Sequence, residues 1–339
     1  MEKEFESGIN YCLMRIGLTL GKFAPLHKGH ELLIKTAINE MDHVIVVIYD
    51  DPITNISLCI RANWIRQLFP QIEVIEGKNA PTVTGYTSEI KRIQENYILK
   101  LLNGITISHF YSSEPYGEHM SRALGAVNRV VDQNRTRIPI SATKIRKDFF
   151  LNKQYVSNVV YKDLITNIVL LGAPSTGKTT LAEHLASFYN TQWMPEYGRE
   201  YWDKYQVDRR LSLDQLVEIA EGHIERENEL LLQSNKFLFS DTNAITTLIF
   251  SYYYHQKALK KLVDLARQAE KRYDLVFVCD TDIPYENTWD RSGIVNRKRF
   301  QKKTIEELHR REIPYYTLSG TIEERTKEAH RILSNYCKY

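Results

Sequence analysis

Two histidines stand three residues apart in a loop that follows a predicted strand. The apolar stretch 15–20 runs into G-K-F-A-P-L-H-K-G-H at 21–30, and the helical pattern ELLIKTAI follows. Ligands of open parallel sheets lie at the carboxyl ends of strands, where a helix that begins offers unpaired N–H groups to a phosphate. His27 and His30 would share one face of the first helical turn and donate to phosphate oxygens. The alternative is a pair of histidines that are only structural.

A second anion motif, P-I-S-A-T-K-I-R, occupies 139–146. Ser141 is the expected N-cap of a helix, and Thr143, Lys144 and Arg146 fall in its first turn. On its own the pattern S-x-T-x-x-R is equally typical of a capped surface helix. Together with the histidine loop, it predicts a site that surrounds a polyphosphate.

A third motif, G-A-P-S-T-G-K-T at 172–179, follows the apolar stretch 168–171 and matches the P-loop pattern G-x-x-x-x-G-K-[ST]. Its N–H groups would surround the phosphates of ATP, Lys178 would reach the β and γ oxygens, and Thr179 would hold Mg²⁺. The expected nucleotide-binding residues are Gly172, Ala173, Pro174, Ser175, Thr176, Gly177, Lys178 and Thr179.

Two carboxylates come directly after predicted strands of the same half. Glu196 follows TQWMP and Asp241 follows FLFS. Strand ends of a parallel sheet face the phosphate site, so one acid would deprotonate an acceptor hydroxyl while the other, Asp241, holds the metal with Thr179. The alternative is that either is a solvated loop acid.

Basic residues cluster between the last two predicted strands, in a segment too polar for a core. They are Arg291, Arg297, Lys298 and Arg299. A lid that closes over the γ-phosphate fits this pattern, with Arg291, Arg297 and Arg299 stabilising the transferring group. A solvated basic surface is the alternative.

The elements that position these motifs alternate between apolar strands and helical patterns along the chain. Strands are expected at 15–20, 44–49, 72–76, 105–111 and 129–131, with helices starting near 28, 57, 88 and 117, and then at 168–171, 191–194, 237–240, 275–279 and 315–318. This pattern predicts an α/β protein with two doubly wound parallel-sheet domains. We expect the domains at 1–150 and 167–339, joined by a linker at 151–166.

Composition excludes several other classes of protein. The 339 residues are 43% hydrophobic and 26% charged, enough apolar material for two cores. No stretch is long and apolar enough for a membrane span or a signal peptide, so we expect a soluble protein. The four scattered cysteines favour a reducing, cytoplasmic location over disulfides or zinc. A net charge of +3 does not predict a nucleic-acid partner.

Residues 15–150 resemble the nucleotidyltransferases that carry an H-x-G-H motif, and among them the NadR-type nicotinamide-mononucleotide adenylyltransferases. S-S-E-P-Y-G at 112–117 is similar to that family's nucleotide-contacting loop. The resemblance implies that His27, His30 and Arg146 catalyse attack of the mononucleotide phosphate on the α-phosphorus of ATP, with Mg²⁺ and without a protein nucleophile. ATP would be bound by Gly21, Lys22, Phe23, His27, His30, Ser112, Glu114, Ser141, Thr143 and Arg146. Arg61 and Trp64 would lie on the mononucleotide side, with a core position as the alternative for Trp64.

The second half resembles the kinase domain of the same family, which phosphorylates ribosylnicotinamide. The matching stretches are the P-loop, P-E-Y-G-R-E-Y at 195–201, S-D-T at 240–242 and the lid. The resemblance implies catalytic roles for Lys178, Glu196 and Asp241. One departure is Pro195, which stands where family members have an aromatic residue for the nicotinamide ring. Trp193 stands two residues earlier, and Tyr197, Tyr201 and Trp202 are the candidates to replace that aromatic residue.

Two other functions compete with a bifunctional enzyme. In the first, the P-loop half binds ATP only as a regulatory sensor of a single-activity adenylyltransferase. In the second, the chain is a DNA-binding repressor, because some family members carry a helix-turn-helix domain in front. About 14 residues precede the first predicted strand, which is too few for that domain, so we expect no repressor. The expected partners are small molecules, namely ATP, nicotinamide mononucleotide and ribosylnicotinamide, and a homo-oligomer is left open.

Overall fold

The structure, a computed structural model, describes residues 14–50, 54–85, 87–207, 210–284 and 294–339, with only the backbone for 294–296. The chain divides into two compact units between Val160 and Tyr161, and each is described by itself below as unit 1 and unit 2. The expected linker at 151–166 contains a 3₁₀ turn, η1 (Lys153–Tyr155), and helix α6 (Asn158–Leu164).

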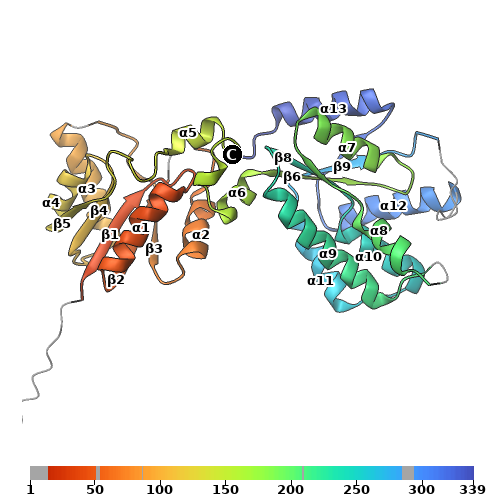
Figure 1. Ribbon diagram of the computed structural model, residues 1–339, viewed down its shortest axis with the longest axis horizontal. Helices are drawn as coiled ribbons and strands as arrows, with labels where there is room; N and C mark the ends of the chain where they lie inside the picture. The colour runs from red at the N-terminus through yellow and green to blue at the C-terminus, as the bar shows by residue number, and fades with distance from the viewer. Residues whose placement is uncertain (1–13, 51–53, 86, 208–209, 285–293) are drawn as a thin grey trace, which may run out of the picture. The chain divides into compact units, whose positions relative to one another are not determined.

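Unit 1 is built on a five-stranded parallel sheet of order β3-β2-β1-β4-β5 (Figure 1). The strands are β1 (Ile16–Gly21), β2 (His43–Tyr49), β3 (Glu73–Gly77), β4 (His109–Ser112) and β5 (Val127–Val130). The helices are α1 (Lys28–Glu40), α2 (Leu58–Leu68), α3 (Ser88–Leu102), α4 (Gly117–Leu124) and α5 (Ala142–Lys147). Because the strand order reverses between β1 and β4, the loops after these two strands meet at one edge of the sheet, where ligands of such folds bind.

Unit 2 is built on a second five-stranded parallel sheet, of order β10-β9-β6-β8-β7. The strands are β6 (Thr166–Leu171), β7 (Gln192–Met194), β8 (Phe237–Asp241), β9 (Leu275–Cys279) and β10 (Tyr316–Leu318). The helices are α7 (Lys178–Phe188), α8 (Tyr197–Tyr205), α9 (Leu213–Leu231), α10 (Ala244–His255), α11 (Lys260–Gln268), α12 (Ile294–Arg310) and α13 (Ile322–Asn335), with the 3₁₀ turn η2 (Ala269–Lys271). Again the order reverses beside the first strand, β6, which carries the P-loop.

The side chains of β6 show why each sheet is covered on both faces. Ile168 and Leu170 pack into one core with helices α7 and α13, whereas Val169 and Leu171 pack into another on the opposite face. Alternate residues of a strand point to opposite faces, so a continuous apolar run marks a strand that is buried on both sides. Helices lie on both faces of the sheet in Figure 1. The predicted fold class, two doubly wound α/β domains, is therefore confirmed.

Some strand boundaries differ from those predicted. The predicted strand 105–111 begins only at His109, because the chain from 105 first turns back onto α3 through a hydrogen bond from Ile105 N to Leu102 O. The last strand of unit 1 is Val127–Val130 instead of 129–131, and all four residues are exposed at the sheet edge. An exposed edge strand lacks the apolar pattern that marks a buried one.

No helix in the described part of the chain is both long and apolar enough to cross a membrane.

Candidate active sites

The loop after β1 packs its two histidines against each other. His27 is the N-cap of α1, and its Nδ1 accepts a hydrogen bond of 3.3 Å from the N–H of His30. The two imidazole rings are stacked with centroids 3.6 Å apart, and the Phe23 ring meets His30 in a T-shaped contact at 4.9 Å. Phe23 adopts a left-handed φ of 48°, which reverses the chain beneath the histidines. The loop thus presents both imidazoles at the start of a helix.

Burial keeps both imidazoles uncharged. Burial first, and the positive charge of Arg135 second, lower the pKa of His27 to about 4. Burial, the neighbouring His27 and Arg135 lower the pKa of His30 well below its ordinary value. The Nδ1 of His30 is a buried atom without a hydrogen-bond partner among the described residues, which leaves Nε2 as its available ring nitrogen. At neutral pH the pair therefore offers N–H donors, and positive charge must come from other residues.

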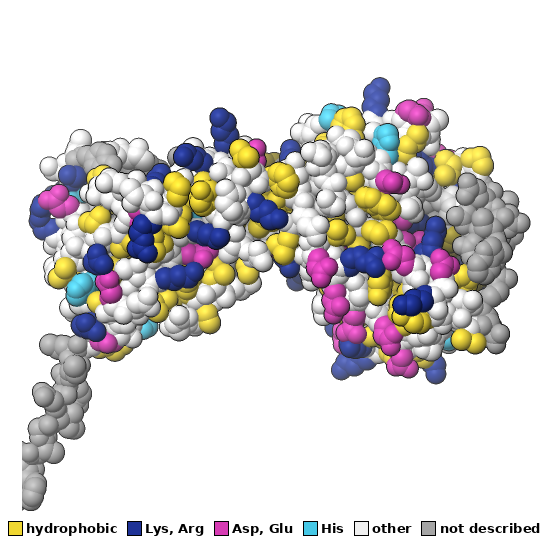
Figure 2. Space-filling model, in the orientation of Figure 1, with side chains coloured by type: hydrophobic (Ala, Val, Ile, Leu, Met, Phe, Trp, Pro, Cys, Tyr) yellow, Lys and Arg dark blue, Asp and Glu magenta, His cyan; other side chains and the backbone are white. Residues whose placement is uncertain are grey.

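Helix α5 brings that charge to the histidine loop. Ser141 caps the helix by accepting a hydrogen bond of 3.3 Å from Lys144 N, as predicted. Arg146 donates through Nη1 to the carbonyl oxygen of Ala24 at 2.5 Å and through Nη2 to Thr143 Oγ1 at 3.2 Å. This contact joins two motifs that are 122 residues apart in the sequence. Figure 2 shows Lys and Arg side chains gathered on the face of unit 1 over α1 and α5.

Arg135 is a further cation of this site that the sequence analysis missed. The Asp132 carboxylate accepts hydrogen bonds from the N–H groups of 136–138, at 2.9 to 3.0 Å, and closes a loop in which Arg135 has a left-handed φ of 52°. Arg135 forms an ion pair of 3.7 Å with Glu114, and its charge acts on both histidines. An aspartate in a polar segment signals such a turn, but no local pattern shows which loop the turn approaches.

The loop after β4 lies at the same sheet edge. Tyr116 donates its hydroxyl to the carbonyl oxygen of Leu20 at 3.0 Å, which ties this loop to the end of β1. A Cβ at Gly117 would lie 2.0 Å from Ser112 Oγ, so this position requires glycine. Ser112 is completely buried, whereas Glu114 is exposed. The Ser112 side chain therefore supports the loop from beneath, as Phe23 does for the histidines, and neither side chain faces solvent.

Arg61 and Trp64 differ from what the resemblance implied. Trp64 is completely buried in unit 1, which is the core alternative. Arg61 is also buried, and its guanidinium donates to the carbonyl oxygens of Ile56, Lys22 and Tyr49. A guanidinium carries five donors in a rigid fork, so one Arg61 can hold the ends of β1 and β2 together. Both side chains therefore lie in the core of unit 1 and not on its surface.

The P-loop of unit 2 lies between β6 and α7. Gly172, Ser175 and Gly177 have left-handed φ values of 135°, 61° and 78°. A Cβ at Gly172 would lie 2.7 Å from the carbonyl oxygen of Cys279, so the first glycine permits this close approach of two strands. Lys178 is buried, and its Nζ donates to the carbonyl oxygen of Ala173 at 3.0 Å. The loop thus has the curled shape that directs successive N–H groups toward phosphates.

Three side chains hold the outside of the P-loop. Arg297 donates to the carbonyl oxygen of Ser175 at 2.9 Å, and Arg325 donates to that of Thr176 at 2.5 Å. Gln301 accepts from Ala173 N at 2.7 Å and donates to the carbonyl oxygen of Cys279 at 3.1 Å. Arg325 and Gln301 were not predicted, because their helices lie more than 120 residues beyond the loop.

The predicted lid differs from the structure at Arg297. This residue is buried against the P-loop carbonyls instead of lying over the phosphates, because it sits on the inner face of α12. Lys298 and Arg299 are exposed on the same helix. Arg291 lies outside the described residues.

Asp241 and Thr179 meet beside the P-loop. The Thr179 hydroxyl donates to Oδ2 of Asp241, while Oδ1 is buried and has no hydrogen-bond partner among the described residues. Burial first, and the negative charge of Glu196 second, raise the pKa of Asp241 to about 6, against the opposing charge of Lys178. Glu196 directly precedes α8 and forms an ion pair of 3.3 Å with Arg199. The two predicted strand-end acids are thus close enough to influence each other.

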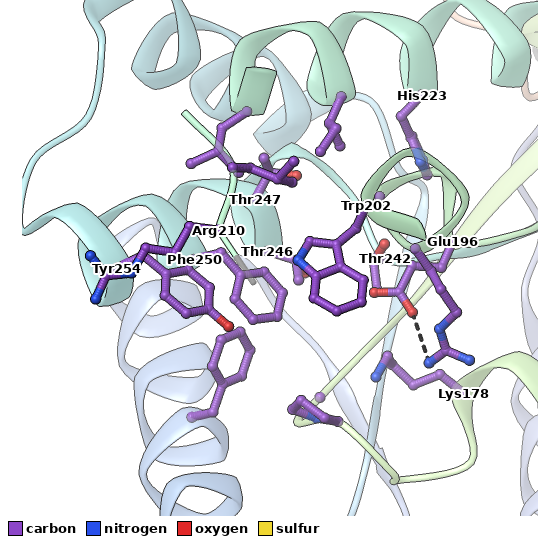
Figure 3. A pocket seen from close by; sticks show the side chains of 18 residues that line it. Lys178, Glu196, Trp202, Arg210, His223, Thr242, Thr246, Thr247, Phe250 and Tyr254 are labelled. Atoms are coloured by element: carbon purple, nitrogen blue, oxygen red, sulfur yellow. Dashed lines mark ion pairs between the residues drawn. The ribbon is translucent and has the colours of Figure 1, made fainter. Parts of the chain in front are cut away.

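A pocket of about 160 Å³ extends from the P-loop along helices α8, α9 and α10 (Figure 3). Its phosphate end is lined by Gly172, Pro174, Lys178, Glu196 and Thr242. Its other side chains include Trp202, Arg210, His223, Thr246, Thr247, Phe250, Tyr254 and Phe300. In the view of Figure 3, Lys178 and Glu196 lie at one end, Trp202 in the middle, and Phe250 and Tyr254 at the other. The pocket therefore joins a phosphate-binding end to an aromatic end.

The aromatic residues that could replace the one missing at Pro195 have different surroundings. Trp202 lines the pocket, whereas Tyr197 packs against Gly222 under the guanidinium of Arg226. Tyr201 donates its hydroxyl to Glu218, and Trp193 packs on the core between β8 and α7. Of these candidates, Trp202 is the one whose side chain lines the pocket. Phe250, Tyr254 and Phe300 were missed, since a run of aromatic residues in a helix is equally typical of a core.

Two family models match separate parts of the chain. A cytidylyltransferase-like model matches residues 18–148, and an AAA-domain model matches residues 167–325. The first covers the histidine loop and α5, and the second begins at β6 and includes the P-loop.

Relatives extend the similarity over nearly the whole chain. The trifunctional NAD biosynthesis/regulator protein NadR of Escherichia coli K12 is 29% identical over 332 residues, covering 88% of this chain and 78% of its own length. A crystal structure of NadR protein in complex with NAD and AMP-PNP has a TM-score of 0.57 at 22% identity, covering 96% of this chain and 97% of its own. A NadR crystal structure in complex with NR has a TM-score of 0.57 at 23% identity, covering 94% and 96%. Over nearly its whole length the chain is thus similar to the NadR proteins, with a cytidylyltransferase-like match in its first part and an AAA-domain match in its second.

Proposed function

We propose that this chain makes NAD, with unit 1 transferring the adenylyl group of ATP to nicotinamide mononucleotide. The observation that carries this proposal is the contact between Arg146 and the carbonyl oxygen of Ala24, which joins α5 to the histidine loop. The relatives' roles in NAD biosynthesis support the choice of substrates. A mononucleotide phosphate oxygen attacks the α-phosphorus of ATP, the bond to the bridging oxygen breaks, and pyrophosphate leaves.

The residues of unit 1 act by binding and positioning. Neutral His27 and His30 donate N–H groups to phosphate oxygens at the start of α1, where the helix dipole also favours negative charge. Lys22, Arg135 and Arg146 supply positive charge for the leaving pyrophosphate. Such donors are fixed before the substrate arrives, so they stabilise charge that develops in the transition state at little reorganisation cost.

An assay with purified protein, ATP, Mg²⁺ and nicotinamide mononucleotide tests this activity. We expect NAD and pyrophosphate in equal amounts. His30→Ala should lower the rate by about two orders of magnitude, the effect of removing one preorganised donor to a developing charge. His109→Ala, at a histidine on β4 bonded to Ser108, is the matched control and should keep the wild-type rate. Absence of NAD with the wild-type protein would refute the proposal.

For unit 2 we propose ATP-dependent phosphorylation of ribosylnicotinamide, which supplies the mononucleotide that unit 1 uses. Glu196 at the phosphate end of the pocket takes the proton of the acceptor's 5′-hydroxyl. The hydroxyl oxygen then bonds to the γ-phosphorus, the bond to the β-phosphate oxygen breaks, and ADP leaves. Lys178 binds the β and γ phosphate oxygens during the transfer. Trp202 stacks on the nicotinamide ring and replaces the aromatic residue that family members have at the position of Pro195.

The side chains beside the P-loop suit Mg²⁺, which prefers oxygen ligands. The Thr179 hydroxyl and the Asp241 carboxylate lie together, and Asp241 Oδ1 is buried without a partner in the described residues. Among these residues no group of three or more His, Cys, Asp or Glu side chains is placed to hold a metal ion, so phosphate oxygens and water would complete the coordination. The ion would be held by Thr179 and Asp241 and would neutralise charge on the transferring phosphoryl group.

A panel of nucleosides tests the kinase. We expect ribosylnicotinamide to be phosphorylated fastest. Asp241→Asn should reduce turnover more than ATP affinity, because Asp241 acts on the metal and does not contribute to phosphate binding by the P-loop. If ATP binds but no nucleoside is phosphorylated, unit 2 is instead a nucleotide sensor.

A cytoplasmic location is part of this proposal. Cys59 and Cys279, within the described residues, are free thiols, which is typical of a reducing compartment.

A further inference from the structure

A buried histidine of unit 2 has no role in the reaction described above. His223 lies on α9, is only 4% exposed, and lines the pocket. Its Nε2 is buried without a hydrogen-bond partner among the described residues and lies 3.8 Å from Oε1 of Glu227, one helical turn further along. A buried polar group without a hydrogen bond costs free energy, and the group closest to compensating Nε2 is the Glu227 carboxylate.

Glu227 is a fixed carboxylate behind this histidine. It is completely buried and accepts hydrogen bonds from Ser240 Oγ and from Arg272 Nε. Although burial favours the neutral acid, contacts with His223 and Arg272 lower the pKa of Glu227 to about 2. A buried carboxylate orients a neighbouring imidazole and selects its tautomer, as second-sphere acids do in other sites. The His223 nitrogen nearest to the Glu227 carboxylate is Nε2, so the carboxylate favours the tautomer of His223 that carries its proton on Nε2.

This pair lies beside the place where the acceptor hydroxyl must be. Glu227 holds Ser240, which directly precedes Asp241 and Thr242 at the carboxyl end of β8. In Figure 3, His223 lies at the end of the pocket where Glu196 and Thr242 also lie, away from Phe250 and Tyr254. The 5′-oxygen must come close to Glu196, and the nicotinamide ring is proposed to stack on Trp202 in the middle of the pocket. The sugar ring therefore lies between Glu196 and Trp202, in the part of the pocket on the side of His223.

With the proton of His223 on Nε2, its other ring nitrogen, Nδ1, is an acceptor. A ribose ring offers two hydroxyl donors, at the 2′ and 3′ positions, and the aromatic part of the pocket offers them little. We propose that His223 is a specificity-determining residue that accepts a hydrogen bond from a ring hydroxyl of the acceptor ribose, and that Glu227 holds it in position. This inference rests on the proposed kinase activity of unit 2, and it makes the acceptor a ribonucleoside.

Deoxy analogues separate this role from a purely structural one. We would measure kcat/KM of the full chain for ribosylnicotinamide and for its 2′-deoxy and 3′-deoxy analogues. The wild-type protein should prefer the ribonucleoside to at least one analogue by about tenfold or more, since a site built for a hydroxyl rejects a ligand that lacks it. In His223→Ala, turnover of the ribonucleoside should fall by about that factor while turnover of that analogue stays the same.

Two further variants complete the experiment. His223→Asn keeps an acceptor at a similar distance from the backbone and should retain part of the preference for the ribonucleoside. His309→Ala is the matched control, because His309 is exposed on α12 and bonded to Tyr315, and it should behave as wild type. If His223→Ala does not fold, His223→Asn carries the comparison.

The outcomes distinguish the two proposals. Equal losses for ribose and deoxyribose acceptors in both His223 variants would make His223 structural and overturn the inference, while the kinase activity stands. An unchanged preference in these variants would also overturn it. If the wild-type protein phosphorylates none of the three compounds, the kinase proposal fails and the inference falls with it.

Discussion

At the scale of single residues, the two sites use opposite electrostatics. The histidines of unit 1 are held neutral by burial and by a nearby cation, so they bind an anion through N–H groups. In unit 2, burial first and the negative charge of Glu196 second raise the pKa of Asp241 to about 6. In each case burial is the first cause of the pKa shift and a neighbouring charge adds to it.

The neutral state of His27 makes unit 1 less stable in acid. Its pKa is about 4 in the folded protein and near 6.5 in the unfolded chain, so unfolding takes up a proton between these values. Stability is therefore lost as the pH falls through this window, by about 2 kcal/mol from pH 7 to pH 5. His27→Asn keeps a capping side chain but cannot titrate, and it should lose about 2 kcal/mol less. Pulse proteolysis at increasing urea concentrations, read out from peptides of unit 1, measures this stability. Equal losses of stability in the wild type and in His27→Asn would contradict the prediction.

The coupling between Glu196 and Asp241 predicts a pH dependence for ATP binding. Removing the negative charge in Glu196→Gln should lower the pKa of Asp241, so this acid stays ionised further into acid. Between pH 7.5 and 5.5, Mg²⁺·ATP affinity of the wild type should fall about fourfold, and that of the variant less than twofold. Calorimetric titration measures both. Glu200→Gln, in the first turn of α8 and paired with Arg226 at 2.8 Å, should follow the wild type, and a fourfold fall in Glu196→Gln would exclude the coupling.

At the scale of elements, close packing of α8 on α9 positions the acceptor side of the pocket. α8 carries Trp202, and α9 carries His223. The Tyr197 ring lies so near α9 that a Cβ at Gly222 would come within 2.5 Å of it. A glycine in the middle of a helix costs helix propensity, so its place here is explained by this contact.

Gly222→Ala should push α8 away from α9. We expect a loss of about 1–3 kcal/mol in stability, the usual cost of overpacking, and a higher KM for the nucleoside because Trp202 moves with α8. Tyr197→Leu in the same chain should restore part of both, since it removes the ring that the new methyl group meets. Denaturation and steady-state kinetics of the two single variants and the double variant check this. Purely additive effects would show that the contact does not set the helix position.

At the scale of the whole molecule, each unit has its own sheet and its own buried core. Each proposed reaction uses residues of one unit only. Lys178→Ala should therefore abolish nucleoside phosphorylation and leave NAD formation from supplied mononucleotide within twofold of wild type, because it removes the cation that follows the β and γ phosphates. His30→Ala should do the reverse. Separate assays of the two reactions measure this, and a loss of both activities in either variant would show that the sites are not independent.

The sequence by itself was enough for most features that depend on neighbouring residues. The helices starting near 28, 57, 88 and 117 begin at 28, 58, 88 and 117, because capping residues and apolar periodicity are local signals. The histidine loop, the P-loop and the two strand-end acids were found in the same way. Their relation also follows, since parallel strands bring their carboxyl ends to one edge of a sheet.

Only the tertiary structure decided which distant side chains meet. Arg135 beside the histidines, Arg325 and Gln301 behind the P-loop, and His223 in the pocket all depend on contacts between segments far apart in the chain. A buried cation and an exposed one look the same in a sequence, as Arg61 shows: three carbonyl oxygens that surround it in the fold allow its burial. Side-chain type determines what chemistry a residue can do, and packing determines whether a ligand can reach it.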